Sequence, residues 1–334
     1  MMKFRIVFLV LFAALSISCK EKTSNTADEI KTEIIRVGYM PDFSGTSAAA
    51  IAQEKGYFQE EGLNVVLLKF LDGPSEINAM LSNNLDFAYI GHGAHSLAIQ
   101  GKVNVLFPNG LSKSEQIIAR KSSGINTILD LKGKTVAAQF GTSSEIFLNL
   151  AINKLGINKD ELNILDMNGP NIVSAMTNGT IDAASVQAPY TFSILNTLGD
   201  EAVPIASIID YSDSGAFPSS WVVTPEYQNA NPDIVNRFSR AILKAMDYRA
   251  NNMNEAVEIV ARQNNSPIET VALEKETALW FSGQNVKEAY LNGKAAEWYK
   301  SQQNVFIYTK TITNTSDISK YVQIKYMIDN VFNN

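Results

Sequence analysis

The chain of 334 residues is 46% apolar and carries a formal net charge of −6, from 28 basic and 34 acidic side chains. The apolar fraction suits a well-packed globular protein, whereas the acidic balance argues against nucleic acid as a partner, because binding to phosphates depends on Lys and Arg. The single cysteine, Cys19, excludes a disulfide framework. We expect no cofactor and no metal ion.

The first 18 residues have the pattern of an export signal. Lys3 and Arg5 precede ten apolar residues at 6–15, and Ser-Ile-Ser at 16–18 leads to Cys19. Ten apolar residues are too few to cross a bilayer, which takes about 20. Residues 1–18 are therefore predicted to be removed as a lipoprotein signal, leaving Cys19 as a lipid-modified N-terminus. A serine stands three residues before Cys19 where lipoprotein signals prefer leucine, so an ordinary signal with a chance cysteine stays the alternative.

Removal of this signal makes the chain more acidic. The signal holds two basic residues and no acidic one, so 26 basic and 34 acidic side chains remain, a net charge of −8. Residues 19–32 are polar and lack aromatic side chains, which is typical of a flexible tether. About 300 residues remain for folded structure, enough for two domains.

Helix and strand patterns alternate from residue 34 to about residue 205. Strands are expected at 34–39, 64–70 and 85–90, and helices at 44–55 and 74–83. Such alternation indicates crossover connections on a sheet rich in parallel strands, that is, an α/β fold.

The sequence repeats itself at an offset of 96 residues. Gly45-Thr46-Ser47 returns as Gly141-Thr142-Ser143, and Asp72-Gly73-Pro74 returns as Asn168-Gly169-Pro170. Asp86 and Asp182 match at the same offset. Two lobes built on one plan explain this repeat; chance similarity of two crossover units is the alternative.

The last third of the chain has a different pattern. After an expected strand at 221–224, helical periodicity predicts helices at 232–251, 254–263, 267–277 and 294–302. Pro232 and Pro267 stand where a proline in the first turn of a helix belongs.

Several short motifs in fixed order resemble one protein family. They are Val37-Gly38-Tyr39-Met40-Pro41, the run Lys55-Gly56-Tyr57-Phe58 with Glu61-Gly62-Leu63, the run 130–136 (Asp-Leu-Lys-Gly-Lys-Thr-Val), Asp182-Ala183, and Ala188-Pro189-Tyr190. Together they are similar to the solute-binding components of ABC importers for nitrate, sulfonates, taurine and thiamine-pyrimidine precursors, over residues 34 to about 250.

This resemblance implies a type II periplasmic binding protein clamshell. Lobe 1 would comprise residues 33–112 and 215–334, lobe 2 would comprise 113–214, and the C-terminal helical extension would pack on lobe 1. The implied partners are a small-molecule ligand and an ABC permease with its ATPase, and the protein would be a monomer held at the membrane by its lipid. An enzyme on the same fold, or a sensor or adhesin, remains the alternative function.

The Gly-Thr-Ser turns are the candidate ligand site. The first N–H groups of a helix lack internal partners and lie at the positive end of the helix dipole, so two such turns facing each other could hold an oxyanion. A sulfonate or taurine is the preferred ligand, with nitrate or a pyrimidine precursor as alternatives. A purely structural role as helix caps is the competing interpretation of both turns.

Residues that follow other strands complete the candidate site, because ligands in open α/β sheets bind beyond the carboxyl ends of strands. His92 could donate to an anion or stack against the ligand. Gln187 suggests a ligand with a hydrogen-bonding group, and aromatic side chains would stack on a ring or wall an aliphatic chain. The full set is Phe43, Ser44, Gly45, Thr46, Gly73, Gly91, His92, Gly93, Gln139, Gly141, Thr142, Ser143, Gln187, Tyr190 and Trp221.

Overall fold

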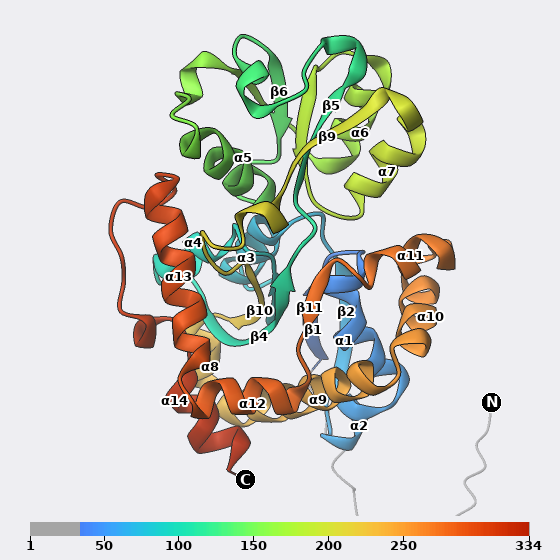
Figure 1. Cartoon of the computed structure of the whole chain (residues 1–334). Coiled ribbons are helices and arrows are strands. Elements are labelled where there is room, and N and C mark those ends of the chain that lie inside the picture. The colour runs from blue at the N-terminus through green and yellow to red at the C-terminus, as the bar shows by residue number, and fades with distance from the viewer. Residues whose placement is uncertain (1–33, 334) are drawn as a thin grey trace, which may run out of the picture. The chain divides into compact units, whose positions relative to one another are not determined.

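The computed structural model describes residues 34–333, which contain two mixed β-sheets with helices on their faces (Figure 1). The predicted signal at 1–18, Cys19 and the tether at 19–32 lie outside the described residues. Among the residues described, no helix combines the length and apolar character needed to cross a membrane.

The first sheet has six strands in the order β11-β4-β10-β3-β1-β2. Strands β1, β2 and β3 run parallel, and β10 joins them antiparallel through β3. The expected first strand is confirmed residue for residue. The bounds are β1 Ile34–Tyr39, β2 Asn64–Lys69, β3 Phe87–Ile90, β4 Asn104–Ser112, β10 Pro218–Val223 and β11 Ala278–Trp280.

The second sheet has five strands in the order β7-β6-β8-β5-β9. Its three parallel strands β7, β6 and β8 repeat the order of β2, β1 and β3, and β5 then pairs antiparallel with β8. The two sheets thus follow one plan, as the 96-residue repeat indicates. The bounds are β5 Gln116–Arg120, β6 Thr135–Ala138, β7 Asn163–Asp166, β8 Ala183–Val186 and β9 Ala202–Ser207.

The chain crosses between the sheets twice. It leaves the first sheet at Ser112 and enters the second at Gln116, and it leaves the second at Ser207 and returns at Pro218. The crossovers are joined by a hydrogen bond from the Ile208 N–H to the Glu115 carbonyl. We use lobe 1 for the part around the first sheet and lobe 2 for the part around the second; their predicted limits in the sequence stay a prediction.

Helices cover both faces of each sheet, and four clusters of buried apolar side chains fill the layers. The bounds of the α-helices are α1 Phe43–Glu54, α2 Tyr57–Glu60, α3 Gly73–Leu81, α4 His95–Ile99, α5 Ser143–Lys154, α6 Gly169–Asn178, α7 Tyr190–Leu198, α8 Pro225–Ala230, α9 Pro232–Asn251, α10 Met253–Asn264, α11 Ile268–Glu274, α12 Gly283–Leu291, α13 Lys294–Tyr308 and α14 Ile324–Met327.

Helix α13 packs on both lobes rather than on lobe 1 alone. At its start, Ala295 belongs to the lobe 1 core, whereas Val305 and Phe306 near its end share a core cluster with Phe147 of α5 (Figure 1). The expected extension on lobe 1 therefore also reaches lobe 2. The expected helix at 294–302 is six residues too short, because its last turns are stabilised by lobe 2.

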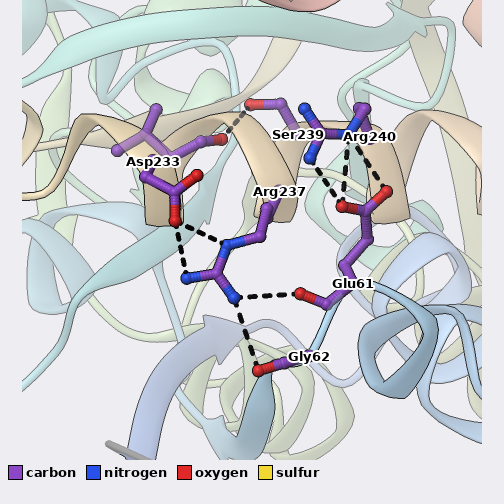
Figure 2. A network of polar contacts seen from close by, with 7 residues as sticks. Glu61, Gly62, Asp233, Arg237, Ser239 and Arg240 are labelled. Carbon is purple, nitrogen blue, oxygen red and sulfur yellow. Dashed lines mark hydrogen bonds and ion pairs between the residues drawn. The ribbon is translucent and has the colours of Figure 1, made fainter.

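The long helix α9 is tied to the turn after α2 by arginine side chains (Figure 2). The Arg240 guanidinium donates to the Glu61 carboxylate at 2.7–3.1 Å, and Arg237 donates to the Glu61 carbonyl at 3.0 Å while pairing with Asp233. Two-point contacts of this kind fix orientation as well as distance. They hold the C-terminal helices against the first crossover unit of lobe 1.

Candidate functional site

A cavity of about 60 Å³ lies between the lobes. A single water needs roughly 10–15 Å³ measured this way, so the space is that of several waters or a small molecule. Its walls come from the residues just after β1, β2, β3, β6 and β8, which are the carboxyl ends of parallel strands. The crossover residues Ser114 and Glu115 and the end of α11 complete the wall.

Nine of the fifteen candidate residues line this cavity, and six do not. Those in the wall are Phe43, Ser44, Gly73, Gly91, His92, Gly141, Thr142, Ser143 and Gln187. Those outside it are Gly45, Thr46, Gly93, Gln139, Tyr190 and Trp221.

The first Gly-Thr-Ser turn is not a ligand-facing helix start, which corrects the expectation for Gly45 and Thr46. Helix α1 begins at Phe43, two residues before Gly45, because the Asp42 carboxylate caps it by accepting from the Gly45 N–H at 2.7 Å. Thr46 is then inside the helix and fully buried, where its hydroxyl donates to the Met40 carbonyl.

The second turn does begin a helix beside the cavity. Thr142 is the N-cap of α5, and its hydroxyl donates to the Gln139 carbonyl and accepts from the Ser144 N–H. The Gly141 N–H is also engaged, since it donates to the Glu145 carboxylate at 2.9 Å. Several of the donors that an oxyanion would need here are therefore taken by the protein itself.

His92 is buried and stacked, although the stacking partner is a protein side chain. Its ring lies 4.0 Å from that of Phe217, and its Nδ1 is 2.9 Å from the Gln302 amide nitrogen. Burial lowers the pKa of His92 well below its usual value, so the imidazole is neutral at pH 7. It therefore offers an anion no positive charge.

Trp221 is a core residue rather than a cleft aromatic. It is fully buried in β10 and packs edge-on against Tyr89 and Phe238. Every residue of β10 is buried, because the strand is central in its sheet and covered on both faces. A strand that is buried on both faces shows no alternation of apolar and polar residues, so its sequence does not tell which face would point to the cleft.

Gln139 and Gly93 connect the lobes instead of lining the cavity. The Gln139 side-chain amide donates to the Asp72 carboxylate at 2.7 Å, from lobe 2 to lobe 1. Gly93 lies against the backbone of Thr142, so closely that a Cβ on Gly93 would be 2.3 Å from the Thr142 carbonyl carbon. Tyr190 lies against Gly169 within lobe 2.

Four carboxylates in the cavity wall were not among the candidate residues: Asp42, Asp72, Glu115 and Glu274. Asp42 and Asp72 each precede a helix and cap it, a position that the sequence could have revealed. Glu115 in the crossover and Glu274 at the end of α11 carry no comparable local signal, because only the tertiary fold brings them here. Among the described residues, no Lys or Arg side chain lines the cavity.

Burial dominates the titration of these carboxyls. Desolvation raises the pKa of Asp42 to about 7, although the two backbone N–H groups that donate to its carboxylate lower the pKa. Desolvation, with the nearby Asp42 charge, raises the pKa of Glu274 to about 8. The pKa of Glu115 is also raised by burial, although the Ser112 and Ser143 hydroxyls oppose the shift.

Residues 45–256 match the family described as NMT1/THI5 like. The match covers more than half of the chain. It includes both crossovers and the strands β2, β3, β6 and β8, whose ends contribute to the cavity wall, whereas β1 precedes it. The chain belongs to the NMT1/THI5-like family. The family resemblance expected from the short motifs is thereby confirmed.

The chain is also similar to individual proteins in sequence and in fold. The NMT1/THI5-like chain is 29% identical to a Brucella abortus protein over 87% of its own length and 91% of that protein, whose name gives it a provisional binding role and no ligand. It is 27% identical to the taurine-binding periplasmic protein of Escherichia coli K12, over 61% and 63% of the two chains. The solved alkanesulfonate-binding protein SsuA of Xanthomonas axonopodis, bound to MOPS, superposes with a TM-score of 0.64 at 19% identity, covering 86% of this chain and 97% of that one. This last likeness establishes the periplasmic binding protein fold.

Proposed function

We propose that the protein is the solute-binding component of an ABC importer, which captures a small organic solute between its lobes and delivers it to a permease. The observation that carries this proposal is the cavity, whose wall is built from both lobes at the carboxyl ends of five parallel strands. Membership of the NMT1/THI5-like family supports it. A ligand that contacts both lobes would favour the closed arrangement over an open one by its differential affinity for the two.

The contacts between the lobes suit reversible closure. The two connections are short, and the Gln139–Asp72 hydrogen bond spans the lobes beside the cavity. We propose that opening breaks this bond and separates Gly93 from Thr142, whereas closure restores both contacts around the solute.

The solute itself is proposed at the level of a small organic molecule. The Gly-Thr-Ser motifs of the sequence favour a sulfonate or taurine, with nitrate or a pyrimidine precursor as alternatives. Asp42 occupies the first turn, and Glu145 accepts from the second. Taurine, which carries an ammonium as well as a sulfonate, suits an acidic wall better than a simple sulfonate or nitrate does.

We propose an extracytoplasmic location with a lipid anchor at Cys19. The signal-like residues 1–18 support export, and the polar segment 19–32 is long enough to separate the lobes from a membrane surface. Intact mass spectrometry of the protein purified from membranes tests the anchor. A mature chain that begins at Cys19 with an added diacylglycerol mass is expected, and an unmodified N-terminus would refute the anchor alone.

The test of solute binding uses the mature protein without its lipid. A metabolite library is screened by thermal shift, since a ligand that binds the folded state raises the melting temperature. Compounds that raise it are measured by calorimetry and recovered from the complex for mass spectrometry. Saturable one-to-one binding with the compound recovered unchanged is expected, whereas chemical conversion would favour an enzyme.

A further inference from the structure

The wall of the cavity is acidic, and no basic side chain offsets it. Asp42, Asp72, Glu115 and Glu274 line the space, with no Lys or Arg among the lining residues. Behind this wall the carboxyl of Glu76 is fully buried, and neither of its oxygens has a hydrogen-bond partner in the structure. Asp42 and Asp72 are close enough to Glu76 to raise its pKa further, after the larger effect of burial.

Glu274 has an oxygen left over for a ligand. The side chain is 4% exposed, and one carboxylate oxygen accepts from the Phe43 N–H at 2.7 Å. Within the described residues the other oxygen forms no hydrogen bond, and Glu274 belongs to the cavity wall. This oxygen borders the cavity and has no donor from the part of the protein that the structure describes, so its lone pairs can accept from a ligand. Its environment therefore favours a ligand that donates.

The start of α1 illustrates why an anion is a poor fit. Its N–H groups are already used by two carboxylates: Gly45 donates to Asp42, and Phe43 donates to Glu274. The charge that a helix dipole attracts is thus supplied by the protein. An added anion would meet like charges instead of free donors.

One buried arginine, Arg249, places a positive charge near the wall, where it opposes the rise in the pKa of Tyr89 that burial causes. Arg249 is fully buried behind the wall and is committed to Ser47, to Asn109 and to the carbonyl of Phe281. It does not line the cavity.

We propose that the solute is an organic cation, such as a primary ammonium or amidinium, whose N–H groups reach Glu274 and the neighbouring carboxylates. This inference rests on the proposed solute-binding function and specifies its ligand class. A bare metal ion fits less well, because among the residues described no three Asp, Glu, His or Cys side chains converge as a metal site would require. Phe43 and Tyr89 in the same wall offer aromatic surface to a cation.

Competition with protons follows from the raised pKa values. With pKa values near 7 and 8, Asp42 is protonated about half of the time at pH 7 and Glu274 is protonated most of the time. The groups that face them are Asp72, Glu76 and Tyr89 from lobe 1 and Tyr190 from lobe 2. A cation must displace these protons, so its affinity rises with pH, whereas the affinity of an anion falls.

The test compares probes that share a carbon frame and differ in charge. Ethylamine, taurine and ethanesulfonate form one set, butylamine, 4-aminobutanesulfonate and butanesulfonate a second, and benzylamine and benzenesulfonate a third. Calorimetry at pH 6.5 and 8.5 gives affinity and the number of protons released. We expect the cation of at least one frame to bind about tenfold tighter than its matched anion, with tighter binding at pH 8.5.

Two variants distinguish the loss of a negative charge at the cavity from a general effect on the fold. Glu274→Gln keeps the shape of the side chain and should weaken binding of the cation about tenfold and flatten its pH dependence. Glu269→Gln makes the same charge change on the exposed face of α11 and should leave the cation affinity and its pH dependence unchanged. Equal loss in the two variants would contradict a direct contact.

The outcomes distinguish this inference from the function on which it rests. Tighter binding of the anions, or no binding by any cation, would overturn the charge assignment and leave solute binding intact. If the metabolite screen also yields no ligand of any charge, solute binding itself fails.

Discussion

Replacing Glu274 by glutamine should stabilise the ligand-free protein at neutral pH. The pKa of this carboxyl is about 8 in the folded protein against an ordinary value of 4.5, because the side chain is buried beside Asp42. The folded state therefore binds a proton that the unfolded state has released, and stability falls as pH rises from about 4.5 to about 8. At pH 7 the linkage relation gives a loss of roughly 3 kcal/mol from this one group, as an upper value for a carboxyl coupled to a neighbour.

The glutamine side chain can still accept from the Phe43 N–H but has no proton to lose. The variant should melt higher than the wild type at pH 7.5, with a gain of about 2 kcal/mol or a few degrees, and the two should converge near pH 4.5. Melting curves from pH 4.5 to 8.5 measure this, with Glu269→Gln as the matched surface control. Parallel curves for wild type and Glu274→Gln would show that Glu274 keeps an ordinary pKa, and the reasoning would be wrong.

Three further substitutions probe the contacts between the lobes and in the core. Gly93→Ala places a methyl group against the Thr142 backbone and should hold the lobes apart. Ligand affinity should fall by at least about tenfold, with little change in melting temperature. Unchanged affinity, together with an unchanged small-angle X-ray scattering profile, would contradict this. Gln139→Leu removes the 2.7 Å bond to Asp72 and should weaken ligand binding by about 1.5 kcal/mol, measured by calorimetry. Arg249→Met leaves Asn109 without its buried donor and should destabilise the fold by about 3 kcal/mol in denaturant unfolding.

The strands and helices of the two lobes could be predicted where local pattern and tertiary structure agree. Helix α9 has the expected bounds, because Pro232 begins it and its apolar periodicity continues to Asn251. Strand β11 was missed, since three residues paired with β4 owe their conformation to that partner rather than to their own sequence. Helix α12, Gly283–Leu291, was missed as well: Ser282 forms a capping box at its start, but Asn285 stands where the sequence signature has Glu or Gln.

The candidate site was predictable in place but not in charge. Strand ends located most of its wall correctly, because the residues after β3 and β8 follow parallel strands, one in each sheet, and ligands bind beyond such ends. The acidic character of the cavity wall depends in part on Glu274, which is 231 positions from its hydrogen-bond partner Phe43 along the chain. No periodicity or local motif reports a contact at that separation.

The helix starts around the cavity show how one motif can indicate opposite chemistries. A glycine and two hydroxyl residues at a helix start suit an anion only while the first N–H groups are unoccupied. At α1 those groups are taken by Asp42 and Glu274, and at α5 the Gly141 N–H is taken by Glu145. A carboxyl that accepts from a helix start keeps a second oxygen for the neighbouring space, and it carries a negative charge there only after it loses its proton. The start of α1, which would hold an oxyanion if its N–H groups were free, is therefore filled by two of the protein's own carboxyls, and under our proposal a ligand cation takes the place of their protons.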